Sequence, residues 1–380
     1  MASLYAHIPF CVRKCEYCDF YSGVAGDAEI ELYLQALDRE FALRAPKGLR
    51  PDTVFIGGGT PTRLSAQQLR TLAAILGRHV DLGSCREFTC EINPGTLTPD
   101  KAQALAAMGV NRASFGVQSF DQKYLRGLGR IYEAGTAPAA VQLARDAGIA
   151  RISVDLMFAL PGQTLAEFHN DLQKALALGT EHISLYALTF EDDTPLTRDL
   201  QSGKVKPASE ELEREMFQLA DEITARAGLP RYEVSNYARP GAQCAHNLVY
   251  WSAGDWHGFG AGAHAMIDGE ISANAADFKH YCEHLAAGKL PLTRQDKQSP
   301  LERAETLLLM GLRLVQGIDL ARFRAFAGQD FTRLCGEPAA RLVALGLLEL
   351  TATHVRVTPE GMFVLDNVIL ELAAGMGVSA

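Results

Sequence analysis

The sequence predicts an α/β protein whose core is a full or partial parallel βα barrel, followed by a smaller α+β unit. Three observations support this. Short β-branched or aromatic runs alternate with helix-period segments over the first two-thirds of the 380 residues. Candidate functional side chains stand where these runs end. After Leu188 the alternation stops and a different pattern begins.

The first part of the chain contains six expected strands with five expected helices between them. The strands are at 4–8, 53–57, 87–92, 112–118, 151–156 and 182–188. The helices are at 28–43, 66–80, 99–108, 136–147 and 165–178. Consecutive βα units form a parallel sheet, and right-handed crossovers close it into a barrel. Because barrel active sites lie at the carboxyl ends of the strands, one mouth should be lined by His7, Gly58, Glu91, Gln118 and Asp155.

The remainder of the chain is expected to form a connecting region and a second domain. A long amphipathic helix is expected at 209–227, a short strand at 232–236, and an irregular functional loop at 240–264. From Leu301 a helix at 301–314, two shorter helices, a hairpin at 347–357 and a last helix from Pro359 suggest a winged-helix-like unit. The expected domains are 1–228 (barrel core), 229–295 (connecting region) and 296–380 (C-terminal domain).

Composition and charge exclude several classes of protein. The net charge of −9 disfavours broad binding to nucleic acid or anionic lipid. For the winged-helix-like unit it therefore favours packing or partner binding over DNA binding. The start has no signal-peptide pattern, and no stretch approaches ~20 apolar residues. Eight cysteines do not make a disulfide scaffold in a chain of this length, so the cytoplasm is expected.

Three cysteines are crowded into the sequence Cys11-Val-Arg-Lys-Cys15-Glu-Tyr-Cys18. Three thiolates on one loop can bind an iron–sulfur cluster and leave one iron open for the amino and carboxylate groups of S-adenosylmethionine (SAM). Structural zinc is the alternative, with His7 as a fourth ligand, but no second cysteine pair follows at finger spacing. Four further cysteines are expected to be core or surface residues: Cys85, Cys90, Cys282 and Cys335.

This CxxxCxxC triplet resembles the signature of the radical SAM superfamily. The resemblance extends to Tyr5-Ala-His-Ile-Pro-Phe-Cys11, Gly57-Gly-Gly-Thr-Pro-Thr62, Gly116-Val-Gln-Ser-Phe120 and Asp155-Leu-Met-Phe-Ala-Leu-Pro-Gly162. These segments match the branch that contains oxygen-independent coproporphyrinogen III oxidase (HemN) and its relative HemW. The C-terminal segments Met310-Gly-Leu-Arg-Leu314 and Thr358-Pro-Glu-Gly361 resemble the accessory domain of that branch. The resemblance implies a partial (βα)6, TIM-like radical SAM barrel.

The resemblance also implies a SAM pocket. Gly57-Gly-Gly-Thr60 follows a strand, where glycine lets backbone approach a ligand closely, and no dinucleotide fingerprint is present. For the carboxylates, strand-end salt bridges are the alternative interpretation. By resemblance to HemN, the SAM-contacting positions are Tyr5, Gly58, Gly59, Thr60, Glu91, Gln118, Arg130, Asp155 and Thr189.

Two departures from HemN and one positive match favour the heme chaperones of this branch. Phe20 stands where HemN has a fourth cysteine, and the chain begins almost at the cluster motif. The segment His246-Asn-Leu-Val-Tyr-Trp251 matches the HNxxYW motif that HemW proteins use for heme. Imidazole is a good axial iron ligand, and Tyr250 and Trp251 offer flat faces to a porphyrin.

Other interpretations of this region stay open. His246 could be a structural histidine beside buried aromatic residues, and Cys244 could be a second iron ligand. His257 and His264 flank a glycine-rich run that suggests close backbone packing against a bound group or an ordinary packed turn.

The resemblance implies a heme chaperone with a [4Fe–4S] cluster and SAM. It would deliver heme to acceptors such as respiratory cytochrome subunits or bacterioferritin-like stores. No nucleic acid and no membrane span are expected; transient membrane association, a homodimer and the identity of the acceptor are left open. The alternative is an enzyme, either the coproporphyrinogen III oxidase or another radical SAM catalyst, so the sequence does not decide whether the protein is an enzyme.

Overall fold

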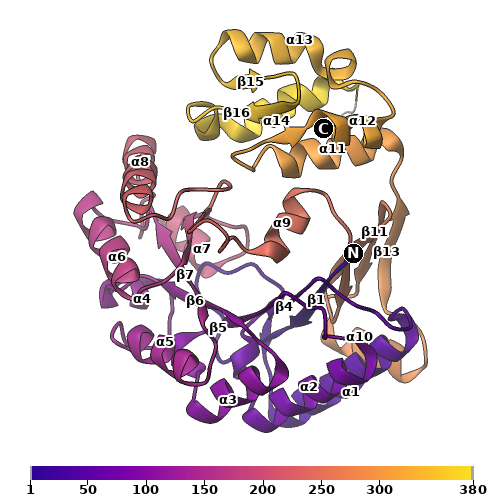
Figure 1. Cartoon of the computed structure of the whole chain (residues 1–380). Helices are drawn as coiled ribbons and strands as arrows, with labels where there is room; N and C mark the ends of the chain where they lie inside the picture. The colour runs from indigo at the N-terminus through magenta and orange to yellow at the C-terminus, as the bar shows by residue number, and fades with distance from the viewer. Residues whose placement is uncertain (1, 378–380) are drawn as a thin grey trace.

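A computed structural model describes residues 2–377. The first residue of the expected barrel domain and the last three of the expected C-terminal domain lie outside the described residues. Figure 1 shows a large α/β body with the C-terminal domain above it.

The body is built on a sheet whose middle strands are the six expected ones. They are β1 (Ser3–Ile8), β4 (Thr53–Gly58), β5 (Glu87–Ile92), β6 (Arg112–Gln118), β7 (Arg151–Phe158) and β8 (His182–Ala187). Each pairs in parallel with the next along the chain. The complete sheet runs β13-β12-β11-β10-β1-β4-β5-β6-β7-β8-β9, with β13 and β9 at opposite edges. The predicted partial barrel is therefore confirmed.

The five helices expected between these strands are also present. They are α1 (Asp27–Arg44), α2 (Ala66–His79), α3 (Pro99–Met108), α5 (Thr136–Asp146) and α6 (Leu165–Ala177), and they cover the outer face of the sheet (Figure 1). Local sequence explains where several begin: Ser65 with Gln68 and Thr164 with Glu167 form capping boxes that satisfy the first backbone N–H groups. The amphipathic helix expected at 209–227 is α8 (Glu210–Arg226).

Short elements fill the connections at the carboxyl ends of the strands, and the sequence pattern did not predict them. They are β2 (Phe10–Cys11), β3 (Gly23–Val24), η1 (Pro61–Arg63), η2 (Pro94–Thr96), α4 (Gln122–Gly127) and α7 (Pro195–Gln201). Most are too short to carry a periodic hydrophobic pattern of their own.

The prediction of an irregular loop at 240–264 is wrong. This segment contains α9 (Ala245–Trp251), β10 (Trp256–Phe259) and the start of β11 (His264–Ile267). β10 pairs in parallel with β1, and β12 (Glu270–Asn274) and β13 (Leu292–Lys297) extend the sheet in antiparallel fashion. The strand expected at 232–236 lies slightly later, as β9 (Asn236–Ala238). The glycine-rich sequence concealed strands whose pairing partners are far away in the chain.

Glu40 of α1 links the barrel to the segment that contains β10 to β12. Its buried carboxylate accepts hydrogen bonds from the Gly260 N–H (2.8 Å), the Asn274 side-chain amide (2.7 Å) and the Tyr281 hydroxyl (2.7 Å). Arg44 lies 3.4 Å from the same carboxylate. Tyr281 belongs to α10 (Phe278–Ala286), so four separate segments meet at one carboxylate.

The C-terminal domain has the predicted winged-helix-like arrangement. Its helices are α11 (Pro300–Gly311), α12 (Leu320–Ala327), α13 (Phe331–Ala344) and, after η3 (Gly361–Val364), α14 (Leu365–Gly375). Its sheet has the order β14 (Ile318–Asp319), β16 (His354–Val357), β15 (Leu348–Leu350). A separate apolar core around Phe323 and Phe331 holds it together. Backbone hydrogen bonds join it to the body, from Val234 to Arg313 (2.9 Å) and from Val315 to Tyr232 (3.0 Å).

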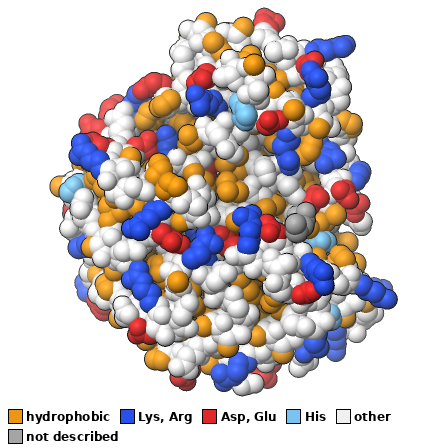
Figure 2. Space-filling view, in the orientation of Figure 1, with side chains coloured by type: hydrophobic (Ala, Val, Ile, Leu, Met, Phe, Trp, Pro, Cys, Tyr) orange, Lys and Arg blue, Asp and Glu red, His pale blue; other side chains and the backbone are white. Residues whose placement is uncertain are grey.

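Two expectations from composition concern the charge of the surface and the absence of membrane-spanning segments. On the face in Figure 2, Lys and Arg side chains are interspersed with Asp and Glu side chains and do not form one basic patch. Within residues 2–377, none of the helices has the length and apolar character needed to cross a membrane.

Candidate functional site

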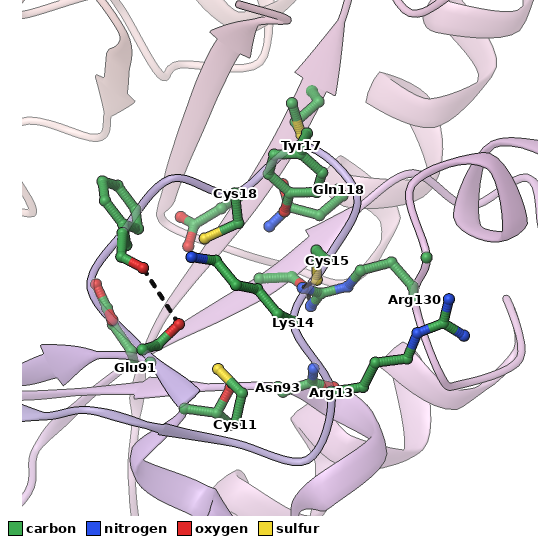
Figure 3. A pocket seen from close by; sticks show the side chains of 18 of the residues that line it. Cys11, Arg13, Lys14, Cys15, Tyr17, Cys18, Glu91, Asn93, Gln118 and Arg130 are labelled. Carbon is green, nitrogen blue, oxygen red and sulfur yellow. Dashed lines mark hydrogen bonds between the residues drawn. The ribbon is translucent and has the colours of Figure 1, made fainter. Parts of the chain in front are cut away.

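A cavity of about 500 Å³ opens at the carboxyl ends of the barrel strands. Cys11, Cys15 and Cys18 all line it, on the loop that follows β1 (Figure 3). The ends of β4, β5, β6 and β7 form the opposite walls. The predicted mouth therefore exists, and the cysteine triplet and the strand ends face the same space.

The cysteine loop is positioned by backbone contacts with distant segments. The Thr60 N–H donates to the Phe10 carbonyl (2.8 Å), and the Cys11 thiol lies 3.8 Å from the Thr60 hydroxyl. Further along, the Glu16 N–H donates to the Leu128 carbonyl (3.1 Å), and the Leu196 N–H donates to the Glu16 carbonyl (2.9 Å). Burial raises the pKa of the Cys18 thiol to about 11, so iron binding would have to displace its proton.

The donor set fits a cluster. In the part of the chain that the structure describes, no three Cys, His, Asp or Glu side chains converge closely enough to hold a single metal ion. In an iron–sulfur cube each cysteine binds a different iron, so three thiols spread around one cavity are suitable ligands. Arg130 also lines the cavity, and within residues 2–377 its buried Nε has no hydrogen-bond partner, which suits an anionic ligand such as a carboxylate.

The glycine-rich turn after β4 has the conformation that its sequence suggested. Gly58 has φ +113°, and a Cβ there would lie 2.6 Å from the His7 ring. Its N–H donates to the Glu91 carboxyl group (3.1 Å). A larger residue at position 58 would therefore be strained and would displace His7.

Two half-buried acidic groups, Glu91 and Asp155, face the cavity together. Burial, and then the neighbouring Asp155, raises the pKa of Glu91 to about 8. Burial also raises the pKa of Asp155, although hydrogen bonds from Ser184 and Ser114 and the charge of Arg112 oppose this. A cationic ligand would stabilise both carboxylates, so the pair suits an ammonium group or ribose hydroxyls.

Gln118 points into the cavity because the end of β6 is irregular. The pairing of β6 with β7 shifts between Gly116 and Gln118, and Gln118 has φ +66°. Tyr132 stabilises this shape by donating its hydroxyl to the carbonyls of Val117 (2.6 Å) and Gly116 (3.1 Å). Sequence reasoning missed Tyr132, since nothing in a single sequence separates it from other buried tyrosines.

The structure brings eight of the nine predicted SAM positions to the cavity lining: Gly58, Gly59, Thr60, Glu91, Gln118, Arg130, Asp155 and Thr189. Tyr5 is not among the lining residues. Tyr5 lies within β1, and its hydroxyl is 2.9 Å from Nδ1 of His7. His7 also stays out of the lining, and its Nε2 lies 3.0 Å from the Tyr21 carbonyl. Both ring nitrogens of His7 are thus occupied, which disfavours the zinc alternative.

The HNxxYW motif lies at the end of the barrel opposite to the cysteine loop. α9 carries it and packs near the amino ends of β4 and β5, where Glu87 accepts hydrogen bonds from the backbone N–H groups of Ala245 and His246 (both 2.9 Å). The Cys244 thiol also points to Glu87 (3.4 Å). The motif therefore does not share the cavity of the cysteine loop.

His246 is fully buried, and both of its ring nitrogens have hydrogen-bond partners. Nδ1 lies 2.8 Å from the Thr53 hydroxyl, and Nε2 lies 2.8 Å from the Tyr250 hydroxyl. Because Thr53 donates its proton to Ser3 (2.7 Å), it accepts from Nδ1–H, and the Nε2 lone pair accepts from Tyr250. Burial lowers the pKa of His246 to about 4, so the ring is neutral at pH 7.

Two further features of this region are the Trp251 indole and the glycine-rich run between His257 and His264. The indole N–H of Trp251 is buried and finds no hydrogen-bond partner among the residues that the structure describes. The glycine-rich run between His257 and His264 forms a turn packed against protein, since a Cβ at Gly260 would lie 2.6 Å from the His7 carbonyl oxygen. Of the two interpretations of that run, the geometry favours the packed turn.

A parallel partial barrel with three loop cysteines at its mouth defines a radical SAM protein. The Radical SAM superfamily model matches residues 5–175, and the HemN C-terminal domain model matches residues 298–364. By sequence the chain is 36% identical to the heme chaperone HemW of Bacillus subtilis, covering 95% of this chain and 96% of that protein. It is 35% identical to the Escherichia coli HemW, covering 97% of each. The chain belongs to the HemW family.

A solved structure agrees on the fold. Coproporphyrinogen III oxidase (HemN) from Escherichia coli superposes with a TM-score of 0.86 at 23% identity, covering 98% of this chain and 90% of that one. The fold is therefore common to both members of the branch and does not distinguish between their activities.

Proposed function

We propose that this protein is a heme chaperone that binds heme and delivers it to heme-requiring proteins. The similarity to proteins named heme chaperone HemW, over nearly the whole of both chains, carries the proposal. Phe20 supports it, because this exposed phenyl group lines the cavity where HemN has a fourth cysteine. This chain therefore lacks the cysteine that the oxidase has at this position.

The cluster and SAM belong at the mouth of the barrel. Cys11, Cys15 and Cys18 would bind a [4Fe–4S] cluster, whose open iron supplies one-electron chemistry toward SAM when both are present. The glycine-rich turn would receive the methionyl part of SAM by backbone contact. Glu91 and Asp155 would bind its amino group or ribose hydroxyls, and Arg130 would bind its carboxylate.

Heme would bind at the HNxxYW motif, with His246 as iron ligand and Tyr250 and Trp251 as porphyrin contacts. Because Tyr250 occupies the Nε2 lone pair of His246, iron ligation requires that hydrogen bond to break and α9 to shift from its present position. We infer that the heme-free protein holds this motif closed and that heme binding opens it. The buried, unpartnered indole N–H of Trp251 is consistent with a segment that has a second arrangement.

The acceptors are inferred to be respiratory cytochrome subunits or bacterioferritin-like stores. Free cysteine thiols at the mouth require a reducing environment, so we place the protein in the cytoplasm.

A heme titration on the anaerobically reconstituted protein tests the proposal. Wild-type protein should give a saturable Soret band, and His246→Ala should weaken binding at least about tenfold while the cluster absorbance stays unchanged. If His246→Ala bound heme as tightly as wild type, the ligand assignment would be lost. Incubation with coproporphyrinogen III, SAM and reductant should yield no protoporphyrinogen; its formation would favour the oxidase.

A further inference from the structure

Arg130 contacts one of the cluster cysteines as well as the cavity. Its NH1 group donates to the Cys15 thiol at 3.4 Å, and its NH2 group donates to the Gly116 carbonyl at 2.5 Å. Figure 3 places the guanidinium beside Cys15 at the edge of the cavity. The Tyr132 ring lies under the guanidinium, 5.2 Å from ring centre to Cζ. The guanidinium is thus oriented by three groups, and one of them is a sulfur.

Backbone packing keeps this contact in place. Gly129, next to Arg130, has φ +72°, and a Cβ there would lie 2.8 Å from the Glu16 side chain. The Glu16 N–H donates to the Leu128 carbonyl (3.1 Å). The loop that carries Cys15 therefore contacts the loop that carries Arg130. The contact is made by Glu16, which follows Cys15, with Leu128 and Gly129, which precede Arg130. These contacts fix the distance between the two backbones, and the Gly116 carbonyl and the Tyr132 ring orient the Arg130 side chain.

Two of the cluster cysteines, Cys11 and Cys15, have different partners. Cys11 is 3.8 Å from the neutral hydroxyl of Thr60, whereas Cys15 receives an N–H from a cation. Hydrogen bonds from charged donors are roughly twice as strong as those between neutral groups. Donors to the sulfurs of an iron–sulfur cluster stabilise the added electron and raise the reduction potential.

We propose that Arg130 tunes the reduction potential of the cluster through its N–H···S hydrogen bond to Cys15, in addition to any role in binding the SAM carboxylate. With a cluster bound, the iron held by Cys15 would be electronically distinct from the iron held by Cys11. This inference does not depend on heme. The electron enters from an external one-electron reductant and resides on the cluster, and no bond to Arg130 forms or breaks.

The test is an anaerobic redox titration of the SAM-free reconstituted protein, followed by electron paramagnetic resonance. Arg130→Met removes the charge and the donor, Arg130→Gln keeps an uncharged donor, and Arg130→Lys keeps the charge. At the wild-type midpoint, Arg130→Met should have about tenfold fewer reduced than oxidised clusters, a shift of about 59 mV to more negative potential for one electron. Arg130→Gln and Arg130→Lys should lie between.

Arg13→Met is the matched control, because Arg13 also lines the cavity but directs its guanidinium to Glu16 (2.7 Å). Its midpoint should stay at the wild-type value. Equal midpoints for wild type and all Arg130 variants would overturn the proposal. So would an equal shift in Arg13→Met, which would show a general charge effect. Loss of iron from all three Arg130 variants would also overturn it, since Arg130 would then hold the cluster in place and not tune it. A colourless wild-type protein would instead refute the cluster itself.

Discussion

Replacing Tyr250 with Phe tests whether His246 is the heme ligand, because it frees the one lone pair that iron needs. In the structure the Tyr250 hydroxyl donates to Nε2 of His246 at 2.8 Å, and Thr53 holds the proton on Nδ1. Tyr250→Phe keeps the aromatic face for a porphyrin but removes that donor. A hydrogen bond of this kind contributes about 1 kcal/mol. Heme no longer has to break it, so affinity should rise about fivefold.

The same change should lower the free energy of unfolding of the heme-free protein by about 1 kcal/mol or more, since a buried acceptor loses its partner. Heme affinity is measured by absorbance titration and stability by urea unfolding. Tyr281→Phe is the matched control, because Tyr281 is a buried tyrosine whose hydroxyl donates to Glu40 at 2.7 Å, away from the motif. It should lose stability without any gain in heme affinity. If Tyr250→Phe stayed folded and bound heme no more tightly than wild type, Nε2 would not be the iron ligand.

Three further predictions concern the cluster, the SAM pocket and the fold. Serine at Cys11, Cys15 or Cys18 should abolish the brown cluster absorbance while circular dichroism stays unchanged; wild-type iron content in all three variants would contradict the cluster assignment. The pKa of Glu91 is about 8, so this group is largely protonated at pH 7. A bound ammonium favours its ionised form, so SAM binding should release about one proton. Calorimetry in buffers of different ionisation enthalpy should detect this release, and Glu91→Gln should lack it. Equal release from both proteins would exclude Glu91. Glu40→Ala should lower the free energy of unfolding, measured in urea, by about 3 kcal/mol or more, because the Arg44 cation loses its buried carboxylate partner; a loss under about 1 kcal/mol would show that the Glu40 contacts contribute little to stability.

The barrel was predictable because its strands and helices repeat in order along the chain. Each of these barrel strands pairs with the next one along the chain, so local periodicity and the right-handed crossover rule are enough to place β1, β4, β5, β6, β7 and β8. The strand ends then bring Gly58, Glu91 and Gln118 to one mouth without further information. The segment around β10 was not predictable in this way, because β10 pairs with β1 at the other end of the chain.

The site shows the same division. By itself the sequence determined the thiol triplet, the glycine-rich turn and the acidic residues at the strand ends, because spacing and strand order specify them. Only the tertiary structure decided that Arg130 reaches Cys15, that Tyr132 shapes the end of β6, and that His246 is buried at the far end of the barrel with both nitrogens engaged. These contacts join segments distant in sequence, and their hydrogen bonds depend on side-chain directions that no local pattern encodes.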